Sequence, residues 1–108
     1  MTIQKISDKA LNNKIIKSDW LAGWTPEDGQ NPWKFYEDGS FKTLKDSHGG
    51  KWWVENSILK LRWTTVDGYA EFVVNSLSNK SLYLSCINSG WEFMRSWKLH
   101  STESTRYN

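Results

Sequence analysis

The sequence predicts an all-β fold, an antiparallel up-and-down meander of about eight strands closed into a small barrel, with a short N-terminal helix. The first observation behind this prediction is that runs of aromatic and aliphatic residues are interrupted about every ten residues by turn-forming pairs. The second is that these runs pair in hairpin registers with aromatic side chains on one face and polar side chains on the other. Such a sheet must cover its apolar face, and closure into a barrel does so where only one short helix is available.

The length and composition indicate one domain. A chain of 108 residues supports a single hydrophobic core, so we expect one domain over 1–108, with a helical segment at 1–17 and the barrel at 20–100. Hydrophobic residues make up 38% of the chain and charged residues 24%, which is ordinary globular composition. The eight tryptophans are unusual, and because each ring buries on the order of 200 Å², few residues can fill the core.

Charge and segment content narrow the partners. The net charge is only +2, with 14 basic and 12 acidic side chains interspersed, so we expect no nucleic-acid partner. No stretch approaches the ~20 apolar residues of a membrane span, and the N-terminus lacks the apolar run of a signal peptide. We therefore expect no membrane partner, and the single Cys86 favours a cytoplasmic location.

The N-terminal part contains the one predicted helix. Ser7 is a suitable N-cap, and Leu11 and Ile15 lie at helical spacing. Both prolines fall in the stretch 25–32, which is predicted to be a loop.

Four turns define the predicted strand pairing. They lie at 37–39, where Gly39 is left-handed, and at 56–57, 67–68 and 89–90. A further loop at 78–80 keeps the faces aligned if it has three residues. The resulting registers pair Phe35 with Phe41, Trp52 with Leu61, Trp63 with Phe72, Cys86 with Phe93, Leu84 with Arg95 and Leu82 with Trp97.

Three segments resemble the small bacterial lipocalin-like domains, which are calycin-type β-barrels. They are Trp-Lys-Phe-Tyr-Glu-Asp-Gly-Ser-Phe at 33–41, Gly-Gly-Lys-Trp-Trp-Val-Glu-Asn-Ser-Ile-Leu-Lys-Leu-Arg-Trp at 49–63, and Leu-Ser-Asn-Lys-Ser-Leu-Tyr-Leu at 77–84. The resemblance covers roughly residues 21–99. It implies a barrel that binds a small, largely apolar molecule through one open end.

The same resemblance implies a tryptophan covered at the closed end by an arginine from the last strand. The nearest match to the Gly-x-Trp of these barrels is Leu-Ala-Gly-Trp at 21–24, one residue short of the usual spacing, with Trp20 also available. The arginine would be Arg95, which is predicted to lie on the last strand. A cation over an indole face is attracted by the ring quadrupole, so Arg95 is interpreted as a structural clasp, with a ligand anchor as the alternative.

The predicted function is non-catalytic binding of a small hydrophobic or amphipathic molecule, without a cofactor. The candidate ligand-binding residues are Trp33, Phe35, Trp52, Trp63, Phe72, Arg95 and Trp97. With Phe41 and Phe93, the six aromatic residues of this set could instead fill a short eight-stranded interior completely. Tyr69, Arg62 and His100 are candidate groups at the rim.

Two other functions remain open. Tyr36, Trp53 and Tyr83 are predicted to face outward, where exposed aromatic residues are typical of a protein- or carbohydrate-interaction surface. A barrel enzyme of the cyclase or isomerase type would need no recognisable motif. We identify no catalytic residue and no metal site, because two histidines and one cysteine are too few ligands. His48 is interpreted as part of a polar hairpin tip, and Cys86 as a buried apolar residue.

Overall fold

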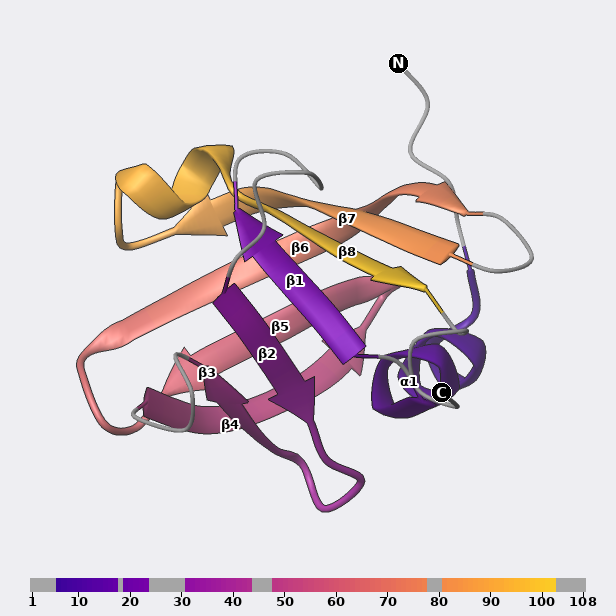
Figure 1. Cartoon of the computed structure of the whole chain (residues 1–108), viewed down its shortest axis with the longest axis horizontal. Coiled ribbons are helices and arrows are strands. Elements are labelled where there is room, and N and C mark those ends of the chain that lie inside the picture. The colour runs from indigo at the N-terminus through magenta and orange to yellow at the C-terminus, as the bar shows by residue number, and fades with distance from the viewer. Residues whose placement is uncertain (1–5, 18, 24–30, 44–47, 78–80, 103–108) are drawn as a thin grey trace.

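The computed structural model confirms the predicted fold, a closed antiparallel barrel of eight strands in the order β1 to β8 (Figure 1). It describes residues 6–17, 19–23, 31–43, 48–77 and 81–102. The elements are α1 (Asp8–Lys17), β1 (Asp19–Gly23), β2 (Asn31–Phe35), β3 (Ser40–Thr43), β4 (His48–Glu55), β5 (Ile58–Trp63), β6 (Gly68–Leu77), β7 (Ser81–Ser89), the 3₁₀ helix η1 (Phe93–Ser96) and β8 (Lys98–Thr102).

The first and last strands close the barrel. Trp20 of β1 lies opposite Ser101 of β8, and Leu21 lies opposite His100. On its other side β1 pairs with β2, so each of the eight strands has two neighbours. Closure leaves no unpaired sheet edge, which removes the usual route to aggregation of a meander.

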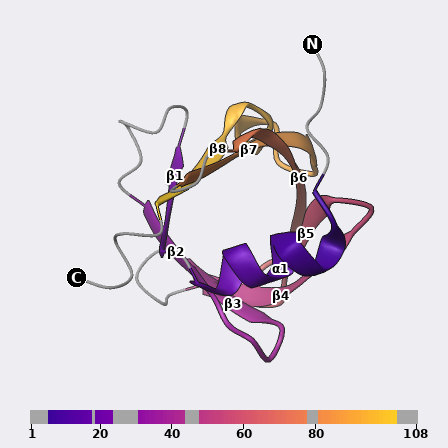
Figure 2. The ribbon, with the colours of Figure 1, turned by 90° about the vertical axis from the view of Figure 1, so that its right-hand side faces the viewer.

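The helix α1 covers one end of the barrel (Figure 2). The backbone carbonyl of Ser7 accepts the Leu11 N–H at 2.9 Å and its hydroxyl accepts the Ala10 N–H at 3.2 Å, which confirms the predicted cap. Leu11 and Ile15 are fully buried. The indole N–H of Trp20 donates to the Ile15 carbonyl at 3.1 Å, so the helix and the first strand are joined by a buried hydrogen bond.

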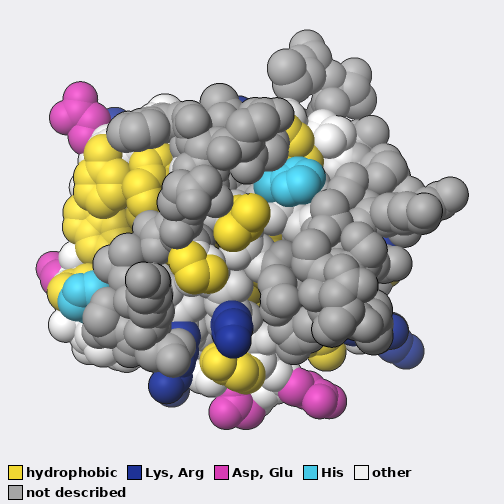
Figure 3. Space-filling model, viewed as in Figure 1, with side chains coloured by type: hydrophobic (Ala, Val, Ile, Leu, Met, Phe, Trp, Pro, Cys, Tyr) yellow, Lys and Arg dark blue, Asp and Glu magenta, His cyan; other side chains and the backbone are white. Residues whose placement is uncertain are grey.

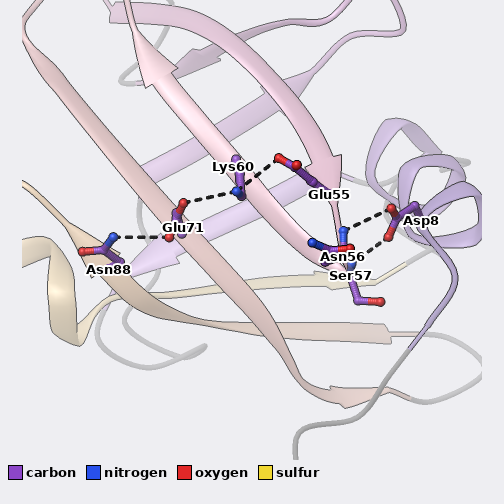
Figure 4. Close-up of polar contacts among 7 residues, drawn as sticks. All are labelled: Asp8, Glu55, Asn56, Ser57, Lys60, Glu71 and Asn88. Carbon is purple, nitrogen blue, oxygen red and sulfur yellow. Dashed lines mark hydrogen bonds and ion pairs between the residues drawn. The ribbon is translucent and has the colours of Figure 1, made fainter.

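A second connection ties α1 to the β4–β5 hairpin (Figure 4). The Asp8 carboxylate accepts the backbone N–H of Asn56 at 3.1 Å and that of Ser57 at 2.6 Å. The Ser57 hydroxyl donates to the carbonyl of Ile6. The first turn of the helix therefore holds the tip of a hairpin that lies far from it in sequence.

Two predicted hairpins are confirmed. Phe35 lies opposite Phe41, and Gly39 has a φ of 91°, the left-handed conformation that its loop requires. In the β4–β5 turn Asn56 and Ser57 have φ values of 55° and 65°, which is the pattern of a type I′ turn. The predicted pairing of β4 with β5 is confirmed along the hairpin.

The predicted two-residue turn at 67–68 is wrong. Trp63 lies opposite Gly68 and not opposite Phe72, because the chain turns through the four residues 64–67. Neither residue of the predicted turn has the positive φ that a primed turn requires. The partner of Trp63 moves by four residues, and because four is even, every side chain keeps its predicted face.

The predicted β7–β8 pairing is also wrong by four residues. Leu82 lies opposite Ser101 and not opposite Trp97, because Phe93–Ser96 forms η1 and the last strand begins only at Lys98. The side chain of Phe93 is consequently 53% exposed, where the strand prediction placed it inside.

The proline-containing loop is shorter than predicted. Most of the predicted loop at 25–32, and all of the loop at 78–80, lie outside the described residues. Asn31 and Pro32 belong to β2, where Pro32 lies opposite Leu21. A proline is tolerated there because it is near the start of a strand.

Large aromatic rings fill the middle of the barrel. Trp20 and Phe35 meet edge to face with ring centroids 6.0 Å apart, and Trp33 and Phe72 meet in the same way at 6.2 Å. Each of these side chains is at most 2% exposed, as is Phe41. The predicted aromatic filling of the interior is therefore confirmed for Trp33, Phe35, Phe41 and Phe72, and Trp20 adds a ring that was not predicted there.

The helix-to-hairpin connection leads to a stability prediction. Asp8→Ala should lower the free energy of unfolding by about 1 kcal/mol, because two backbone N–H groups lose a charged acceptor at a site that water partly reaches. The measurement is urea unfolding followed by circular dichroism. Glu37→Ala, at an exposed acidic position in the β2–β3 turn, is the control and should change stability by less than about 0.5 kcal/mol. Equal effects of the two substitutions would refute the connection.

Candidate functional site

A cavity of about 220 Å³ lies at the end of the barrel opposite α1. It is bounded by the mouth of the barrel and by the segment that contains η1. Its wall is formed by Trp33, Thr43, His48, Trp63, Val66, Trp91, Phe93, Met94 and Trp97. Five of these nine residues are aromatic rings of tryptophan or phenylalanine.

The five rings form a closed circle of contacts. Trp33 meets Trp63 at a centroid distance of 5.6 Å, and Trp63 meets Trp91 at 4.9 Å. Trp91 stacks on Phe93 at 6.0 Å, and Phe93 meets Trp97 at 5.6 Å. Trp97 returns to Trp33 at 6.2 Å, which completes the circle. We call these five residues the aromatic circle, and the cavity that they line the aromatic pocket.

Barrel strands supply the inner part of the aromatic circle. Trp33 lies in the middle of β2 and Trp63 is the last residue of β5. Both are almost fully buried, at 2% and 5% exposure, because each also packs against the filled core. This part of the pocket wall is therefore as rigid as the barrel.

The segment around η1 supplies the outer part. The Met94 N–H donates to the Trp91 carbonyl at 3.1 Å, and the Trp97 N–H donates to the Met94 carbonyl at 2.9 Å. The Trp97 carbonyl then accepts the Cys86 N–H at 3.0 Å, which joins the end of η1 to β7. Trp91 and Trp97 are partly buried, so the outer wall is the more accessible one.

Ser89 and Gly68 position Trp91. The buried Ser89 hydroxyl donates to the Tyr69 carbonyl at 2.8 Å and accepts the Trp91 N–H at 3.1 Å. The six-membered part of the Trp91 indole lies where a Cβ of Gly68 would be, so a larger residue at position 68 would overlap it. The Tyr69 ring lies in turn 3.0 Å from the Cβ position of Gly90.

The remaining wall is weakly polar. Thr43 donates its hydroxyl to the His48 carbonyl at 3.3 Å, and His48 Nδ1 lies 3.1 Å from the Thr65 hydroxyl. Among the nine wall residues that the structure describes, His48 alone carries a titratable side chain. The prediction that His48 belongs to a hairpin tip needs adjustment, because it begins β4 and faces this cavity; residues 44–47 lie outside the described chain.

Two buried indole N–H groups of the aromatic circle have no hydrogen-bond acceptor. The indole Nε1 atoms of Trp33 and Trp97 are both buried, and neither has a hydrogen-bond partner among the described protein groups. Two other indoles do have acceptors. The Trp20 N–H donates to the Ile15 carbonyl, and the Trp52 indole N–H donates to the Tyr36 carbonyl at 2.9 Å. Buried unpaired donors are rare in folded proteins, because leaving such a group without a partner costs free energy.

The structure brings three of the seven candidate binding residues to the cavity, namely Trp33, Trp63 and Trp97. Phe35, Trp52 and Phe72 belong to the filled core and do not form part of this wall.

Arg95 does not lie where the sequence placed it. It is in η1 and not on the last strand, its side chain is exposed, and its Nε donates to the Ser89 carbonyl at 3.2 Å. It therefore fastens η1 to the end of β7, at the end of the barrel away from α1. Of the two tryptophans considered for the clasp, Trp20 is covered by α1, and Trp24 lies outside the described residues.

The predicted rim residues lie elsewhere. Arg62 and Tyr69 border a shallow groove on the outer face of β5 and β6. His100 of β8 meets the Tyr83 ring at 6.1 Å. None of the three belongs to the wall of the aromatic pocket.

Sequence reasoning missed Trp91 and Met94 as wall residues, although a signal was present. Trp91, Met94 and Trp97 are spaced three apart, which is the period of a 3₁₀ helix and not the alternation of a strand. Reading this segment as a strand hid the fact that all three share one face. Thr43, His48 and Val66 carried no comparable pattern.

Cys86 is confirmed as a buried residue. The predicted pairing with Phe93 is wrong, because Phe93 lies in η1 and the Cys86 N–H donates instead to the Trp97 carbonyl. Burial raises the pKa of the Cys86 thiol, so the neutral form is favoured in the folded protein. A neutral buried thiol is a poor nucleophile, which fits a packing role.

Comparison with protein-family models, with curated proteins and with solved structures finds no match. Neither helix in the described part of the chain is long and apolar enough to cross a membrane. Among the described residues, no three His, Cys, Asp or Glu side chains gather as a possible metal site. Any functional proposal therefore depends on the geometry of the described residues.

The Gly68–Trp91 contact predicts a coupling between the two positions. Gly68→Ala should lower the free energy of unfolding by about 1–3 kcal/mol, because the added methyl overlaps the indole. In a Trp91→Ala background the same substitution should have a much smaller effect, since the obstacle is gone. Urea unfolding of the four proteins of this cycle measures the coupling, and additive effects would show that Trp91 does not rest on Gly68.

The raised pKa of Cys86 predicts slow alkylation of the folded protein and a free energy of unfolding that depends on pH. At about pH 8, iodoacetamide should react with Cys86 on the order of tenfold more slowly in the folded protein than in the urea-unfolded one. Because the folded-state pKa is raised, the contribution of Cys86 to stability is present below the ordinary thiol pKa of about 8.5 and is lost as the pH rises above it. Wild type should therefore lose more stability at high pH than Cys86→Ala. Equal alkylation rates in the two states would contradict the burial.

Proposed function

We propose that the protein binds a small, predominantly apolar molecule without transforming it, and that the ligand occupies the cavity lined by the aromatic circle. The carrying observation is the closed circle of Trp33, Trp63, Trp91, Phe93 and Trp97 around a volume of about 220 Å³. Pockets for small molecules are typically concave, mostly apolar and aromatic, with few polar groups.

The accessibility of the pocket supports this proposal. Phe93 is 53% exposed although it is a large apolar side chain, and Trp91 and Trp97 are only partly buried. Figure 3 shows hydrophobic side chains gathered on the surface at the left of the view, over the end of the barrel that bears η1. An exposed apolar group at the mouth of a cavity is available to cover a ligand that enters it.

We further propose that the protein is lipocalin-like, with its ligand at the mouth of the barrel. The closed eight-stranded antiparallel barrel is the architecture that this family uses to hold a small ligand. Here Trp20, Phe35, Phe41 and Phe72 occupy the interior, so we place the ligand at the mouth and not at the centre. Of the candidate binding residues, Trp33, Trp63 and Trp97 are therefore the ones proposed to contact it.

The outer face of the barrel offers a second candidate function. Trp53 and Tyr69, at 43% and 39% exposure, border a shallow groove on β4 to β6 together with Arg62. Lys60 beside them is engaged with Glu55 at 3.2 Å and with Glu71 at 3.7 Å (Figure 4). Two exposed aromatic rings beside a groove favour a protein or carbohydrate surface, the interaction-module alternative.

A single experiment separates these functions. An apolar fluorescent dye should bind the wild-type protein saturably and with one-to-one stoichiometry. Phe93→Ala should weaken dye binding by about tenfold, because it removes one member of the aromatic circle and its contacts with Trp91 and Trp97. The exposed position of Phe93 keeps the fold intact, which circular dichroism checks. The matched control is Trp53→Ala, an exposed aromatic residue of the outer face, which should leave dye binding unchanged.

The opposite pattern would favour the other readings. Loss of binding in Trp53→Ala, with Phe93→Ala unaffected, would move the site to the outer groove. Chemical conversion of a bound molecule, detected by mass spectrometry after incubation, would favour the barrel-enzyme alternative.

A further inference from the structure

We infer that the groove on the outer face of β4 to β6 binds an acidic saccharide, a chain of sugar rings that carry carboxylate groups. We call this groove, lined by Trp53, Lys60, Leu61, Arg62, Tyr69, Ala70 and Glu71, the outer groove. It is a second site, so the inference goes beyond the proposed ligand of the aromatic pocket and does not rest on it.

The outer groove lies on a completely described part of the sheet. Residues 48–77, which contain β4, β5, β6 and the turns between them, are all described. On the two sides the register continues to Ser40 of β3, opposite Lys51, and to Asn88 of β7, opposite Glu71. The neighbours of the groove residues in the sheet are therefore all described.

Two exposed aromatic rings stand on the outer groove. Trp53 of β4 lies opposite Lys60 and Tyr69 of β6 lies opposite Arg62, so the rings flank β5 from its two sides. A sugar ring has an apolar face of C–H groups and carries its hydroxyls around the edge. It can therefore stack its face on an indole or phenol ring while its hydroxyls stay in contact with polar groups or water.

Two cations beside these rings have no counter-charge in the described chain. Lys51 and Arg62 lie directly opposite each other in β4 and β5, and both are exposed. Neither has an ion-pair partner among the described residues. Like charges in this position destabilise a sheet, and in a closed barrel they protect no edge. An anionic group bound between them would remove the repulsion.

The neighbouring Lys60 shows the contrast. Its ammonium lies 3.2 Å from Glu55 and 3.7 Å from Glu71 (Figure 4). Glu71 also accepts a hydrogen bond from the Asn88 amide at 3.2 Å, so its carboxylate is held in place. The acids of this face are thus engaged around Lys60, and Arg62 is left as a free donor.

Donors and acceptors in one groove favour a saccharide over a nucleic acid. Hydroxyl groups both donate and accept, so a sugar can use the Arg62 guanidinium and the Glu71 carboxylate together. Single-stranded nucleic acid also stacks on aromatic rings beside cations. Its phosphates recur at every nucleotide, however, and would meet the carboxylates of Glu55 and Glu71 next to the rings.

The size of the outer groove fits part of an extended chain. Its volume is about 140 Å³, whereas pockets that enclose a small molecule measure roughly 300–1,000 Å³. A sugar ring can lie in the groove while the adjoining rings run along the surface of the sheet. An oligosaccharide, and not a single enclosed sugar, is therefore the expected ligand.

The test compares acidic and neutral trisaccharides of the same linkage. The pairs are β-1,4-linked trimannuronic acid with mannotriose, and α-1,4-linked trigalacturonic acid with galactotriose, which differ by a carboxylate in place of a hydroxymethyl group. Calorimetry at low salt should show that wild type binds at least one acidic trimer about fivefold or more tightly than its neutral match. Arg62→Gln should weaken the acidic trimer by about three- to fivefold and change the neutral one by less than about twofold.

A second variant tests the stacking, and two controls match the variants. Trp53→Ala should weaken acidic and neutral trimers alike, by about five- to tenfold, because both present the same ring face. Lys17→Gln, which removes an exposed cation of α1, and Phe93→Ala, which removes an exposed ring of the aromatic pocket, should leave trimer binding unchanged. Circular dichroism checks the fold of each variant.

A readout on the wild-type protein does not depend on how a variant folds. In ¹H–¹⁵N spectra, the indole peak of Trp53, assigned from its loss in Trp53→Phe, should shift when the acidic trimer is added. The shift should shrink at high salt, because the two cations are exposed and salt screens exposed charges.

The outcomes are separate from those for the aromatic pocket. Equal binding of acidic and neutral trimers, or no binding of either, overturns the inference, and so does binding of oligothymidine in their place. If the apolar dye still binds in those cases and Phe93→Ala weakens it, the proposed function stands alone. If the acidic trimer binds and the dye does not, the outer groove stands and the pocket proposal is wrong.

Discussion

The packing of Trp33 connects the filled core of the barrel with the pocket at its end. Its ring contacts Phe35 and Phe72 on the core side, with centroid distances of 6.5 and 6.2 Å, and Trp63 and Trp97 on the pocket side at 5.6 and 6.2 Å. It is therefore the last layer of the filled barrel and the floor of the aromatic pocket at once. Because interiors are close-packed and transmit strain, the shape of the pocket is set by the same contacts that stabilise the fold.

The two ends of the barrel are built differently from similar materials. At one end α1 covers Trp20, whose indole N–H donates to Ile15, and Asp8 binds the backbone of the neighbouring hairpin. At the other end η1 leaves Phe93 exposed and two indole donors unpaired. One end is covered by a helix that is hydrogen-bonded to the barrel, and the other has exposed apolar side chains. The two ends of the barrel therefore differ in exposure and in hydrogen bonding.

Much of the fold was predictable because local turn chemistry and the two-residue period of strands constrain each other. Gly39 and the Asn56–Ser57 pair have the backbone conformations that their loops required, so both registers were right. The errors at β5–β6 and β7–β8 were each four residues long, an even number, so inward side chains stayed inward along the strands. A polar alternation identifies the faces of a strand but does not count the residues in its turn.

The site was less predictable because it depends on the segment where the period changes. The spacing of Trp91, Met94 and Trp97 follows a 3₁₀ helix, while the residues on both sides follow strands. Trp33, Trp63 and Trp97 were recognised as inward rings, but periodicity alone could not show which inward rings fill the core and which border a cavity. That distinction arises from three-dimensional packing, as does the lack of a partner for an indole N–H.

The unpaired donors also have an energetic meaning. Leaving a buried N–H without a partner costs about 1–3 kcal/mol, and a domain of this size is stable by only about 5–15 kcal/mol. The dense contacts of the aromatic rings must offset this cost.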